Sequence, residues 1–478
     1  MDYISWIEEN KESIIASLQE LVKIKSVQED RCVMADGTIL PFGTGVEKAY
    51  QRTLSMGRDF GFEVADFDHY GGHIDFKSEN ADAEIFGIAA HLDVVPEGDG
   101  WTEHEPYSAD IDGGYMYGRG TTDDKGPLVA CLYAMKALKE CGIKPKKNIR
   151  LILGLDEEIG QIGMDYYLEK AGMPDFGITP DGDFPVINGE MGIIVLTLAE
   201  KLPRKVNKGE LTLRKLQSGT MPNVVPGTAR AVIASGDKAD YERIKELAAS
   251  YAKKTGYEVH VRKTGSSLAV ETVGTSAHGA KPWDGLNAIS IMMELLGKIE
   301  FAQDEINDFI QFYNDHIGFN LHGENIGCGF SDEPSGKLIF NVGMAEVSEE
   351  LASVVINIRY PVTIKGTDVT DDIEKMLDGT KIGIVKQLDE KPIYIEEGDE
   401  LVTKLMEAYV EETGDIENKP IVIGGGTYAK KLERTLAFGA LFPGEEDRMH
   451  QADERVNLES FVKYAKIYAK AIYKLTCE

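Results

Sequence analysis

Three successive stretches decide the fold: AEIFGIAAHLD (83–93), KGPLVACLYAMKALKECG (125–142) and IRLILGLDEE (149–158). The first and third contain apolar runs without polar alternation, which is typical of strands buried on both faces. The second repeats apolar side chains at helical spacing, and Gly142 follows as a stop signal. A strand, a helix and a strand in this order predict an α/β fold with a mostly parallel, mixed sheet and helices on both faces.

The N-terminal stretch 5–24 combines charged residues with apolar residues at helical spacing, and Ser5 and Glu8 have the spacing of a capping box. We expect one amphipathic helix here, because a signal peptide would need a basic start and an unbroken apolar run. No stretch approaches the roughly 18 apolar residues that span a membrane. The five cysteines are scattered without a CxxC pair, which fits a reducing compartment. We therefore expect a cytoplasmic protein with no membrane partner.

The charge balance argues against nucleic acid as a partner. The 478 residues include 51 Lys and Arg against 81 Asp and Glu, a formal net charge of −30. Such a charge repels nucleic acid and anionic membrane surfaces. Its ordinary explanation is a solvated acidic surface, although carboxylates that gather locally could hold divalent cations.

Beyond residue 186 the predicted strands are half exposed, because apolar and polar residues alternate. Two sets of segments there have the order strand, helix, strand. The first set comprises 228–235, 238–255, 257–263 and 267–274, and the second comprises 351–364, 368–378 and 382–388. This order suggests an internal duplication, with two ferredoxin-like halves, but the sequences of the two sets differ and duplication is not the only explanation.

Near residue 390 the chain returns to helical patterns, with one apolar strand at 420–426. The simplest organisation is a discontinuous α/β domain, 1–185 plus 386–478, interrupted by an inserted α+β domain, 186–385. No low-complexity linker marks either junction.

Potential metal ligands follow the apolar runs, where α/β sheets place their sites. They are His91 and Asp93 in the first stretch, Asp123 and Asp124 before the helix, Asp156, Glu157 and Glu158 in the third stretch, Asp181 in TPDGDFP (179–185), and His450 in FPGEEDRMHQADE (442–454). Each has a plainer explanation by itself: a structural histidine, a helix N-cap, a solvated turn or a plain turn. A carboxylate two residues after His91 can also hold one imidazole nitrogen, so that the other faces a metal.

Taken together, two histidines and three carboxylates can hold two divalent metal ions, with one carboxylate bridging them. Such ions, roughly 3.5–4 Å apart, bind a water between them and lower its pKa. A further carboxylate that binds no metal must then take the proton from that water. Glu157, beside the candidate ligand Glu158, is placed for this task. The residues alone therefore predict a two-metal hydrolase.

Several motifs resemble those of a known metallopeptidase family. HLDVVPEGDGW (91–101), GRGTTDDKGP (118–127), LDEEIG (155–160), PDGDFP (180–185) and GEEDRMHQADE (444–454) are similar to motifs of the family of aminoacylase, carboxypeptidase G and succinyl-diaminopimelate desuccinylase. Their order and spacing span nearly the whole chain. TPDGDFPVINGE (179–190), MPNVVPGTA (221–229) and IGGGTYAK (423–430) resemble the peptidase V branch of Xaa-His or carnosinase-like dipeptidases.

This resemblance implies a role for each member of the candidate set. His91 and Asp181 would hold one metal, Glu158 and His450 the other, and Asp123 would bridge the two. Glu157 would be the general base and acid, and Asp93 would orient His91. The metals would be zinc, manganese or cobalt, and the affinity order favours zinc.

In the family that the motifs resemble, the inserted domain is a lid, and a histidine from it stabilises the tetrahedral oxyanion. His278 in GTSAHGAKP (274–282) matches that histidine. Simple members of the family dimerise through a lid about half as long and take the histidine from their partner. The inserted domain here is long enough for two lid halves in one chain, so we expect a functional monomer.

The resemblance also implies contacts with a substrate. Asn223 and Arg359 look like the groups that bind the substrate carboxylate, although an arginine on a strand is by default a surface residue. The glycine run from Gly424 would let the backbone approach a peptide closely, and its contacts would come from Gly425, Gly426 and Thr427.

These features imply a metal-dependent dipeptidase that hydrolyses short peptides with a free C-terminal carboxylate, by means of a metal-bridging water that Glu157 activates. An N-acyl amino acid deacylase or a desuccinylase of the same family is the alternative, but such enzymes typically have the smaller lid. A catalytically inactive binding protein is a second alternative, although every expected ligand position is filled. The accepted side chains are left open.

Overall fold

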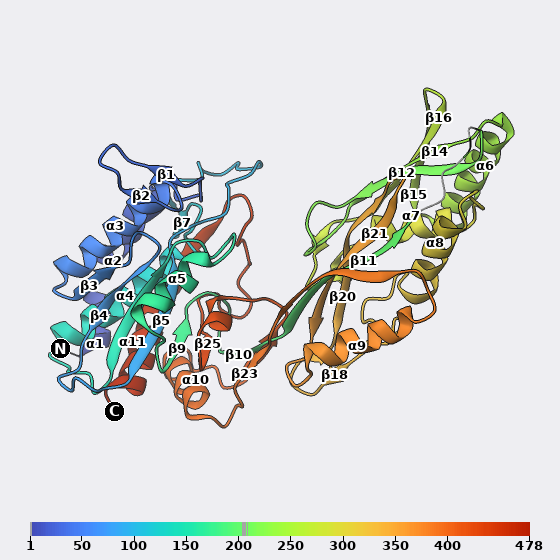
Figure 1. Cartoon of the computed structure of the whole chain (residues 1–478). Coiled ribbons are helices and arrows are strands. Elements are labelled where there is room, and N and C mark those ends of the chain that lie inside the picture. The colour runs from blue at the N-terminus through green and yellow to red at the C-terminus, as the bar shows by residue number, and fades with distance from the viewer. Residues whose placement is uncertain (1, 203–206, 208) are drawn as a thin grey trace. The chain divides into compact units, whose positions relative to one another are not determined.

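The computed structural model describes residues 2–202, 207 and 209–478, and the chain forms two compact units. Unit 1 comprises Met1–Gly189, Ile395–Val422 and Gly426–Glu478, and unit 2 comprises Glu190–Tyr394 and Ile423–Gly425. Both ends of the chain belong to unit 1 (Figure 1). Within the described part of the chain, every helix is too short or too polar to cross a membrane.

Unit 1 is built on a mixed sheet with the strand order β10, β25, β9, β5, β8, β4, β3. In that order the strands are Ile187–Glu190, Thr435–Ala437, Phe176–Thr179, Ile85–His91, Asn148–Gly154, Gly72–Phe76 and Glu63–Asp66. The central strands β25, β9, β5 and β8 are parallel, and the outer pairs are antiparallel. The predicted α/β fold with a mixed sheet is confirmed.

Side chains of the central strands alternate between two apolar clusters, which explains why these strands are mostly apolar. Ile88 and Ala90 of β5 belong to the large cluster, whereas Ala89 between them belongs to a smaller one. In β8, Leu153 and Ile152 divide in the same way. The sheet is therefore covered on both faces.

Helices supply much of the rest of both clusters. The large cluster takes its side chains from α1 (Tyr3–Glu9), α2 (Lys11–Val22), α3 (Thr44–Asp59), α4 (Lys125–Glu140), α10 (Glu400–Thr413) and α11 (Leu458–Thr476). The smaller cluster takes them from α5 (Ile162–Ala171) and the 3-10 helix η2 (Tyr428–Lys431). Almost the whole of α4 is buried, which is why its sequence is apolar on most sides.

Short strands complete unit 1. β1 (Cys32–Val33) pairs with β2 (Ile39–Leu40), and a three-stranded sheet has the order β26 (Arg455–Asn457), β7 (Tyr115–Tyr117), β6 (Ile111–Asp112). Where the chain passes between the units it forms β23 (Ile393–Tyr394) and β24 (Ile421–Ile423). The antiparallel pairing of β26 with β7 brings the segment after His450 next to the segment before Asp123.

The single helix predicted over 5–24 is wrong, because the structure divides this stretch into α1 and α2 at Asn10. The side chain of Asn10 donates to the carbonyl oxygen of Trp6 at 2.8 Å, and such local bonds compete with a continuing helix. The N-cap is Asp2 and not Ser5, since the Asp2 carboxylate accepts from the backbone N–H of Ser5 at 3.0 Å.

Unit 2 contains an eight-stranded antiparallel sheet. In spatial order its strands are β15 (Glu258–Thr264), β16 (Ser267–Val273), β14 (Thr228–Ala234), β12 (Thr212–Ser218), β20 (Ile339–Val347), β21 (Leu351–Tyr360), β11 (Gly192–Lys201) and β22 (Gly383–Glu390). Figure 1 shows α6 (Lys238–Thr255), α7 (Ala288–Leu296), α8 (Asp304–His316) and α9 (Gly366–Leu377) along one face of this sheet. The smaller elements are β13 (Val224–Val225), β17 (Ala277–His278), η1 (Pro282–Asp284), β18 (Ser331–Asp332) and β19 (Gly336–Lys337).

The two halves of this sheet repeat one topology outward from the β12–β20 pair. In one half α6 connects β14 to the edge strand β15, and in the other α9 connects β21 to the edge strand β22. The strand next to the edge is β16 in the first half. In the second half it is β11, which comes from the beginning of unit 2. The arrangement supports an internal duplication whose second copy is assembled from separate parts of the chain.

Gly154, the last residue of β8, lies against the buried ring of Tyr428, and a Cβ at Gly154 would come within 2.3 Å of that ring. We expect Gly154→Ala to lower the free energy of unfolding of unit 1 by about 1–3 kcal/mol, the usual effect of overpacking. Urea unfolding followed by circular dichroism measures this change.

Gly160→Ala is the matched control, because nothing lies within 4 Å of a Cβ added there. It should alter the free energy of unfolding by less than about 0.5 kcal/mol. Equal stabilities of the Gly154→Ala and Gly160→Ala proteins would contradict the packing described for Tyr428.

Candidate metal centre

The candidate site lies at one edge of the sheet of unit 1, where parallel strands end. The strands β5, β8 and β9 are parallel, so their carboxyl ends share an edge. His91 is the last residue of β5, Glu157 and Glu158 follow the end of β8, and Asp181 follows β9. Potential ligands from three segments that are far apart in sequence therefore lie close together.

Asp123 lies between two histidines. Its Oδ1 is 2.8 Å from Nε2 of His91, and its Oδ2 is 2.8 Å from Nε2 of His450. The same nitrogen of His450 lies 3.1 Å from Oε1 of Glu158. Asp123 lies two residues before the first residue of α4, so the buried position of that helix fixes where the carboxylate lies.

The ligand atoms of this site face a common space. Nε2 of His91 and Oδ1 of Asp123 are buried and close together, yet among the described residues neither atom has a partner with hydrogen-bond geometry. Two sets of ligand atoms lie within 4.8 Å of one another: His91, Asp123 and Glu158, and His91, Glu157 and Asp181. Imidazole nitrogens and carboxylate oxygens are ligands of zinc and related divalent ions. The residues present therefore fit a divalent metal site.

Glu157 belongs to the second of these sets. Its Oε1 accepts a hydrogen bond from Nε2 of Gln161 at 2.8 Å. Burial raises the pKa of Glu157 well above its ordinary value, and the carboxylates of Asp181 and Glu158 add to the rise although His91 opposes it. A carboxyl group in these surroundings holds a proton more readily than a solvated one.

The pKa values of the other candidate ligands are shifted in different directions. Burial raises the pKa of Asp181 to about 7, and the neighbouring Asp123 contributes to this. Burial also opposes ionisation of Asp123, but the adjacent imidazoles of His450 and His91 hold its pKa well below the usual range. Burial lowers the pKa of His450, but its bonds to Asp123 and Glu158 outweigh this and raise the pKa to about 11. Of the Asp123 and Asp181 carboxyl groups, that of Asp123 is therefore the one that loses its proton more readily.

Asp93 connects His91 to the turn that carries Glu157 and Glu158. The sequence predicts that the carboxylate of Asp93 orients His91, but the structure gives the closer contact to its carbonyl oxygen, which is 2.9 Å from Nδ1 of His91. The carboxylate is 3.5 Å from the same nitrogen. It accepts instead from the backbone N–H of Glu157 at 3.1 Å and of Glu158 at 3.0 Å. Because Nδ1 of His91 is held by an acceptor, Nε2 is available to face a metal.

The capping explanation of Asp124 holds for its position but not for its side chain. Asp124 occupies the N-cap position of α4, but its side chain makes no capping bond. Its Oδ2 accepts from the backbone N–H of His91 at 3.1 Å instead. The physical reason is that this N–H, at the end of a buried strand, needs an acceptor.

Two neighbours of the site were not predicted from the sequence. Gln161 donates to Glu157, and its position four residues later was an available signal, because side chains at that spacing often meet. Tyr428 packs its ring at 88° to the ring of His91, with 6.4 Å between the ring centroids. Tyr428 comes from a distant part of the chain, so no local pattern points to it.

Unit 2 contains the residues expected to bind a carboxylate. Arg359 on β21 is 5% exposed, so the default expectation of a surface position is wrong here. Its Nε donates to Oδ1 of Asn357 at 3.0 Å, and no carboxylate among the described residues forms an ion pair with it. Burial lowers the pKa of Arg359 to about 10. A buried guanidinium without an ion-pair partner is suited to an anionic ligand.

Asn223 and His278 lie close together in the backbone of unit 2. Asn223 precedes β13, which pairs with β17 so that Val224 is opposite His278. Nδ2 of Asn341 donates to the carbonyl oxygens of Pro222 at 3.0 Å and Val224 at 3.2 Å, on either side of Asn223. The sequence did not reveal Asn341, because its position on β20 gives no sign of this contact.

The glycine run is divided between the units. Gly424 and Gly425 belong to unit 2, whereas Gly426 and Thr427 belong to unit 1. Oγ1 of Thr427 accepts from the backbone N–H of Ala429 at 3.1 Å and so caps η2.

Comparison with known proteins connects this geometry to a family. The sequence profile of peptidase family M20/M25/M40 matches residues 87–474. The YtjP protein of Bacillus subtilis (strain 168) is 36% identical over 468 residues, which cover 97% of each chain. The Beta-Ala-Xaa dipeptidase of Lactobacillus delbrueckii subsp. lactis is 34% identical over 473 residues, covering 98% of this chain and 97% of the relative.

A solved structure shows the same fold. The aminoacylhistidine dipeptidase of Vibrio alginolyticus has a TM-score of 0.55 and 18% identity, covering 97% of each chain. The resemblance inferred from the motifs is thereby confirmed at the level of the family. Because the profile spans most of the sequence and these relatives exceed 30% identity along nearly all of it, the chain belongs to peptidase family M20/M25/M40.

Proposed function

We propose that this chain is a metal-dependent dipeptidase that hydrolyses short peptides with a free C-terminal carboxylate. The observation that carries the proposal is the gathering of His91, Asp123, Glu157, Glu158 and Asp181 at the carboxyl ends of parallel strands. The name of the Lactobacillus delbrueckii relative, a Beta-Ala-Xaa dipeptidase, supports the same reaction.

In this proposal His91 and Asp181 hold one divalent ion, Glu158 and His450 hold the second, and Asp123 bridges the two. The contacts of Asp123 with both histidines support the bridging role. We propose zinc as the working metal, because the affinity order of divalent ions favours it, with manganese or cobalt as alternatives that the same ligands accept.

Divalent ions bound there would polarise the scissile carbonyl and lower the pKa of the attacking water. Glu157 takes the proton from that water and passes it to the leaving amine. Gln161 fixes one carboxylate oxygen of Glu157, and the raised pKa suits a group that must hold a proton between the two transfers. Asp93 keeps Nδ1 of His91 occupied, so that Nε2 stays available as a ligand.

We assign catalysis to unit 1, as the discontinuous domain, and substrate capture to unit 2, as the lid. Arg359 and Asn223 would bind the carboxylate of the substrate, and His278 would stabilise the oxyanion. The burial of Arg359 without an ion pair supports its part of this assignment. The backbone of Gly425, Gly426 and Thr427 would lie along the peptide.

We also propose that the enzyme works as a monomer in the cytoplasm. The two repeated halves of unit 2 support a complete lid within one chain. All five cysteines are free, which supports a reducing compartment.

A substrate panel tests this function. Protein stripped of metal would receive zinc, manganese or cobalt, and each dipeptide would be offered in free, C-amidated and N-acetylated form. Metal-dependent cleavage of the free dipeptides, with weak activity on the blocked forms, is the expected result. Cleavage of N-acylated amino acids alone would favour the deacylase alternative, and no cleavage with any metal would favour a binding protein.

Removal of the carboxylate of Glu157 should separate chemistry from metal binding. We expect Glu157→Gln to retain two metal ions per chain but to lower kcat by at least about 10²–10⁴-fold, the usual contribution of a general acid or base. Atomic absorption gives the metal content, and dipeptide hydrolysis gives kcat. Glu169→Gln, at an exposed position on α5, is the control and should change neither.

The same pair of measurements can reject the assignment. Full activity in Glu157→Gln protein that holds both metals would exclude Glu157 as the base. Loss of one metal would make Glu157 a ligand, as its place beside His91 and Asp181 would then require.

Replacement of Arg359 should impair only substrates with a free carboxylate. Because hydrogen bonds to charged groups contribute about 1.5–3 kcal/mol, Arg359→Met should lower kcat/KM for free dipeptides by about 10–100-fold. The activity on C-amidated analogues should stay unchanged. Arg230→Met, on β14 of the same sheet with an exposed guanidinium, is the control. An equal loss on free and amidated substrates would refute carboxylate recognition by Arg359.

A further inference from the structure

One buried carboxylate, Glu454, joins two distant segments of unit 1. The side chain is 0% exposed, and its Oε1 accepts from the backbone N–H groups of Gly120 and Thr122, both at 3.0 Å. Its Oε2 lies 2.6 Å from Nη1 of Arg119. The carbonyl oxygen of Glu454 accepts from the N–H of Gly118 at 2.9 Å. All three oxygens of this residue are therefore bonded to the segment 118–122.

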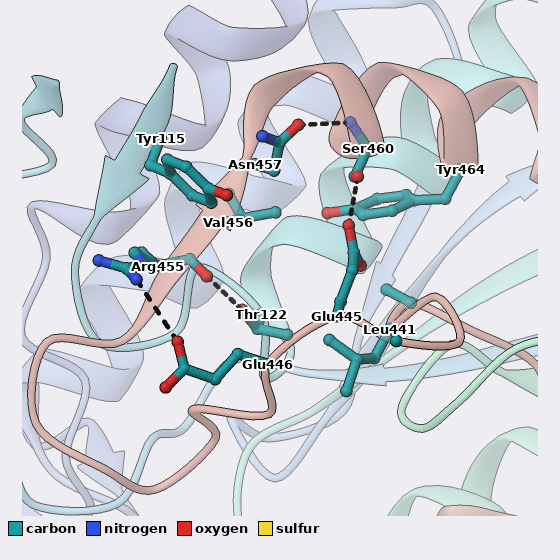
Figure 2. Close-up of a pocket in the computed structure, with 12 residues that line it drawn as sticks. Tyr115, Thr122, Leu441, Glu445, Glu446, Arg455, Val456, Asn457, Ser460 and Tyr464 are labelled. Atoms are coloured by element: carbon teal, nitrogen blue, oxygen red, sulfur yellow. Dashed lines mark hydrogen bonds and ion pairs between the residues drawn. The ribbon is translucent and has the colours of Figure 1, made fainter. Parts of the chain in front are cut away.

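These bonds connect the segments that present Asp123 and His450. The segment 118–122 leads directly into Asp123, and His450 lies shortly before Glu454 in the sequence. The connection continues past Glu454, because Oγ1 of Thr122 donates to the carbonyl oxygen of Arg455 at 3.3 Å (Figure 2). Beyond this bond β26 and β7 pair as strands. The two segments are thus bonded to each other along one continuous stretch.

His450 depends on its main chain for its position. Its side chain is 53% exposed, and its backbone has a φ of +61°, in the left-handed region. Among the described residues, its polar contacts are with Asp123 and Glu158, which are themselves candidate ligands. Packing therefore does not fix the imidazole. The loop around His450 must be held from both sides, and Glu454 is the buried residue that ties it to the Asp123 segment.

The opposite side of the loop is held differently. The Glu445 carboxylate accepts from Oγ of Ser460 and from the backbone N–H of Phe442. Figure 2 shows the Glu445–Ser460 bond and the Thr122–Arg455 bond in the wall of one pocket, which is lined by residues on both sides of His450. Glu445 anchors the loop to α11, whereas Glu454 anchors it to the other ligand segment.

We propose that Glu454 is a positioning residue of the metal centre: it locks the Asp123 segment to the His450 segment, so that both side chains reach the same ion. This inference rests on the proposed metal-dependent function. Groups that orient metal ligands without binding the metal typically contribute about 10–100-fold to metal affinity. Arg119, which is 1% exposed, forms an ion pair with Glu454 and neutralises its buried charge.

The test is a calorimetric titration of metal-stripped protein with zinc alone or manganese alone. Glu454→Gln keeps the shape, but its amide cannot accept from both Arg119 and the two backbone N–H groups. Glu454→Asp keeps the charge beside Arg119 but withdraws it from the backbone. We expect each variant to bind one of two ions about 10–100-fold more weakly, with the other ion within about threefold of the wild type. Activity at low metal concentration should fall and should recover when the metal concentration exceeds the weakened Kd.

Asp75→Asn is the matched control. Asp75 is also buried and paired with an arginine, with Oδ1 and Oδ2 each 2.9 Å from nitrogens of Arg150. It lies on β4 and touches neither ligand segment, so its replacement should lower thermal stability but leave both metal affinities unchanged.

The outcomes separate the two proposals. A wild-type protein that binds no divalent ion would refute the proposed function. Wild type and folded Glu454 variants that bind both ions equally tightly would overturn the positioning role alone. Failure of both Glu454 variants to fold would make Glu454 a folding residue, and would overturn the positioning role as well.

Discussion

At the carboxyl ends of β5, β8 and β9, repulsion between buried carboxylates is the constraint on which the site depends. Two like charges 4 Å apart repel by about 4 kcal/mol at the effective dielectric of a protein near its surface. Parallel strands bring Glu157, Glu158 and Asp181 together, and His91 and His450 offset only part of their charge. Burial and mutual repulsion leave Glu157 and Asp181 with raised pKa values. A divalent cation relieves the same repulsion without protons.

Carboxylates that are not proposed ligands also surround the site. Asp93, Asp124 and Glu454 each accept backbone N–H groups from a segment that carries a ligand. Strand ends and tight turns leave such groups without a partner, and a buried N–H must find one. These bonds hold the ligand segments in place against the forces between the ligands.

Much of the architecture was predictable because its signals are local. Apolar runs that stop at acidic residues mark buried strands, and β5 and β8 lie within the stretches that predicted them. The gathering of His91 and the acidic residues follows from parallel strands that share an edge. Other features depend on contacts between distant residues. No local sequence pattern indicates that the carbonyl oxygen of Asp93, and not its carboxylate, contacts His91. None indicates that Glu454 bonds to the segment 118–122.

The topology of unit 2 was also only partly predictable from the sequence. The repeated order strand, helix, strand was visible, but the second half is completed by β11 from the start of the unit. Because this strand is displaced in sequence, a comparison of the two halves along the chain aligns only part of them. The burial of Arg359 was hidden for a similar reason, since an arginine on a strand is ordinarily at the surface.

Anomalous X-ray diffraction from zinc-loaded crystals tests the assignment of two metal ions, because it locates the ions without reference to activity. We expect two peaks roughly 3.5–4 Å apart, one beside His91 and Asp181 and the other beside Glu158 and His450, with Asp123 between them. A single peak, or peaks away from the ends of β5, β8 and β9, would contradict it.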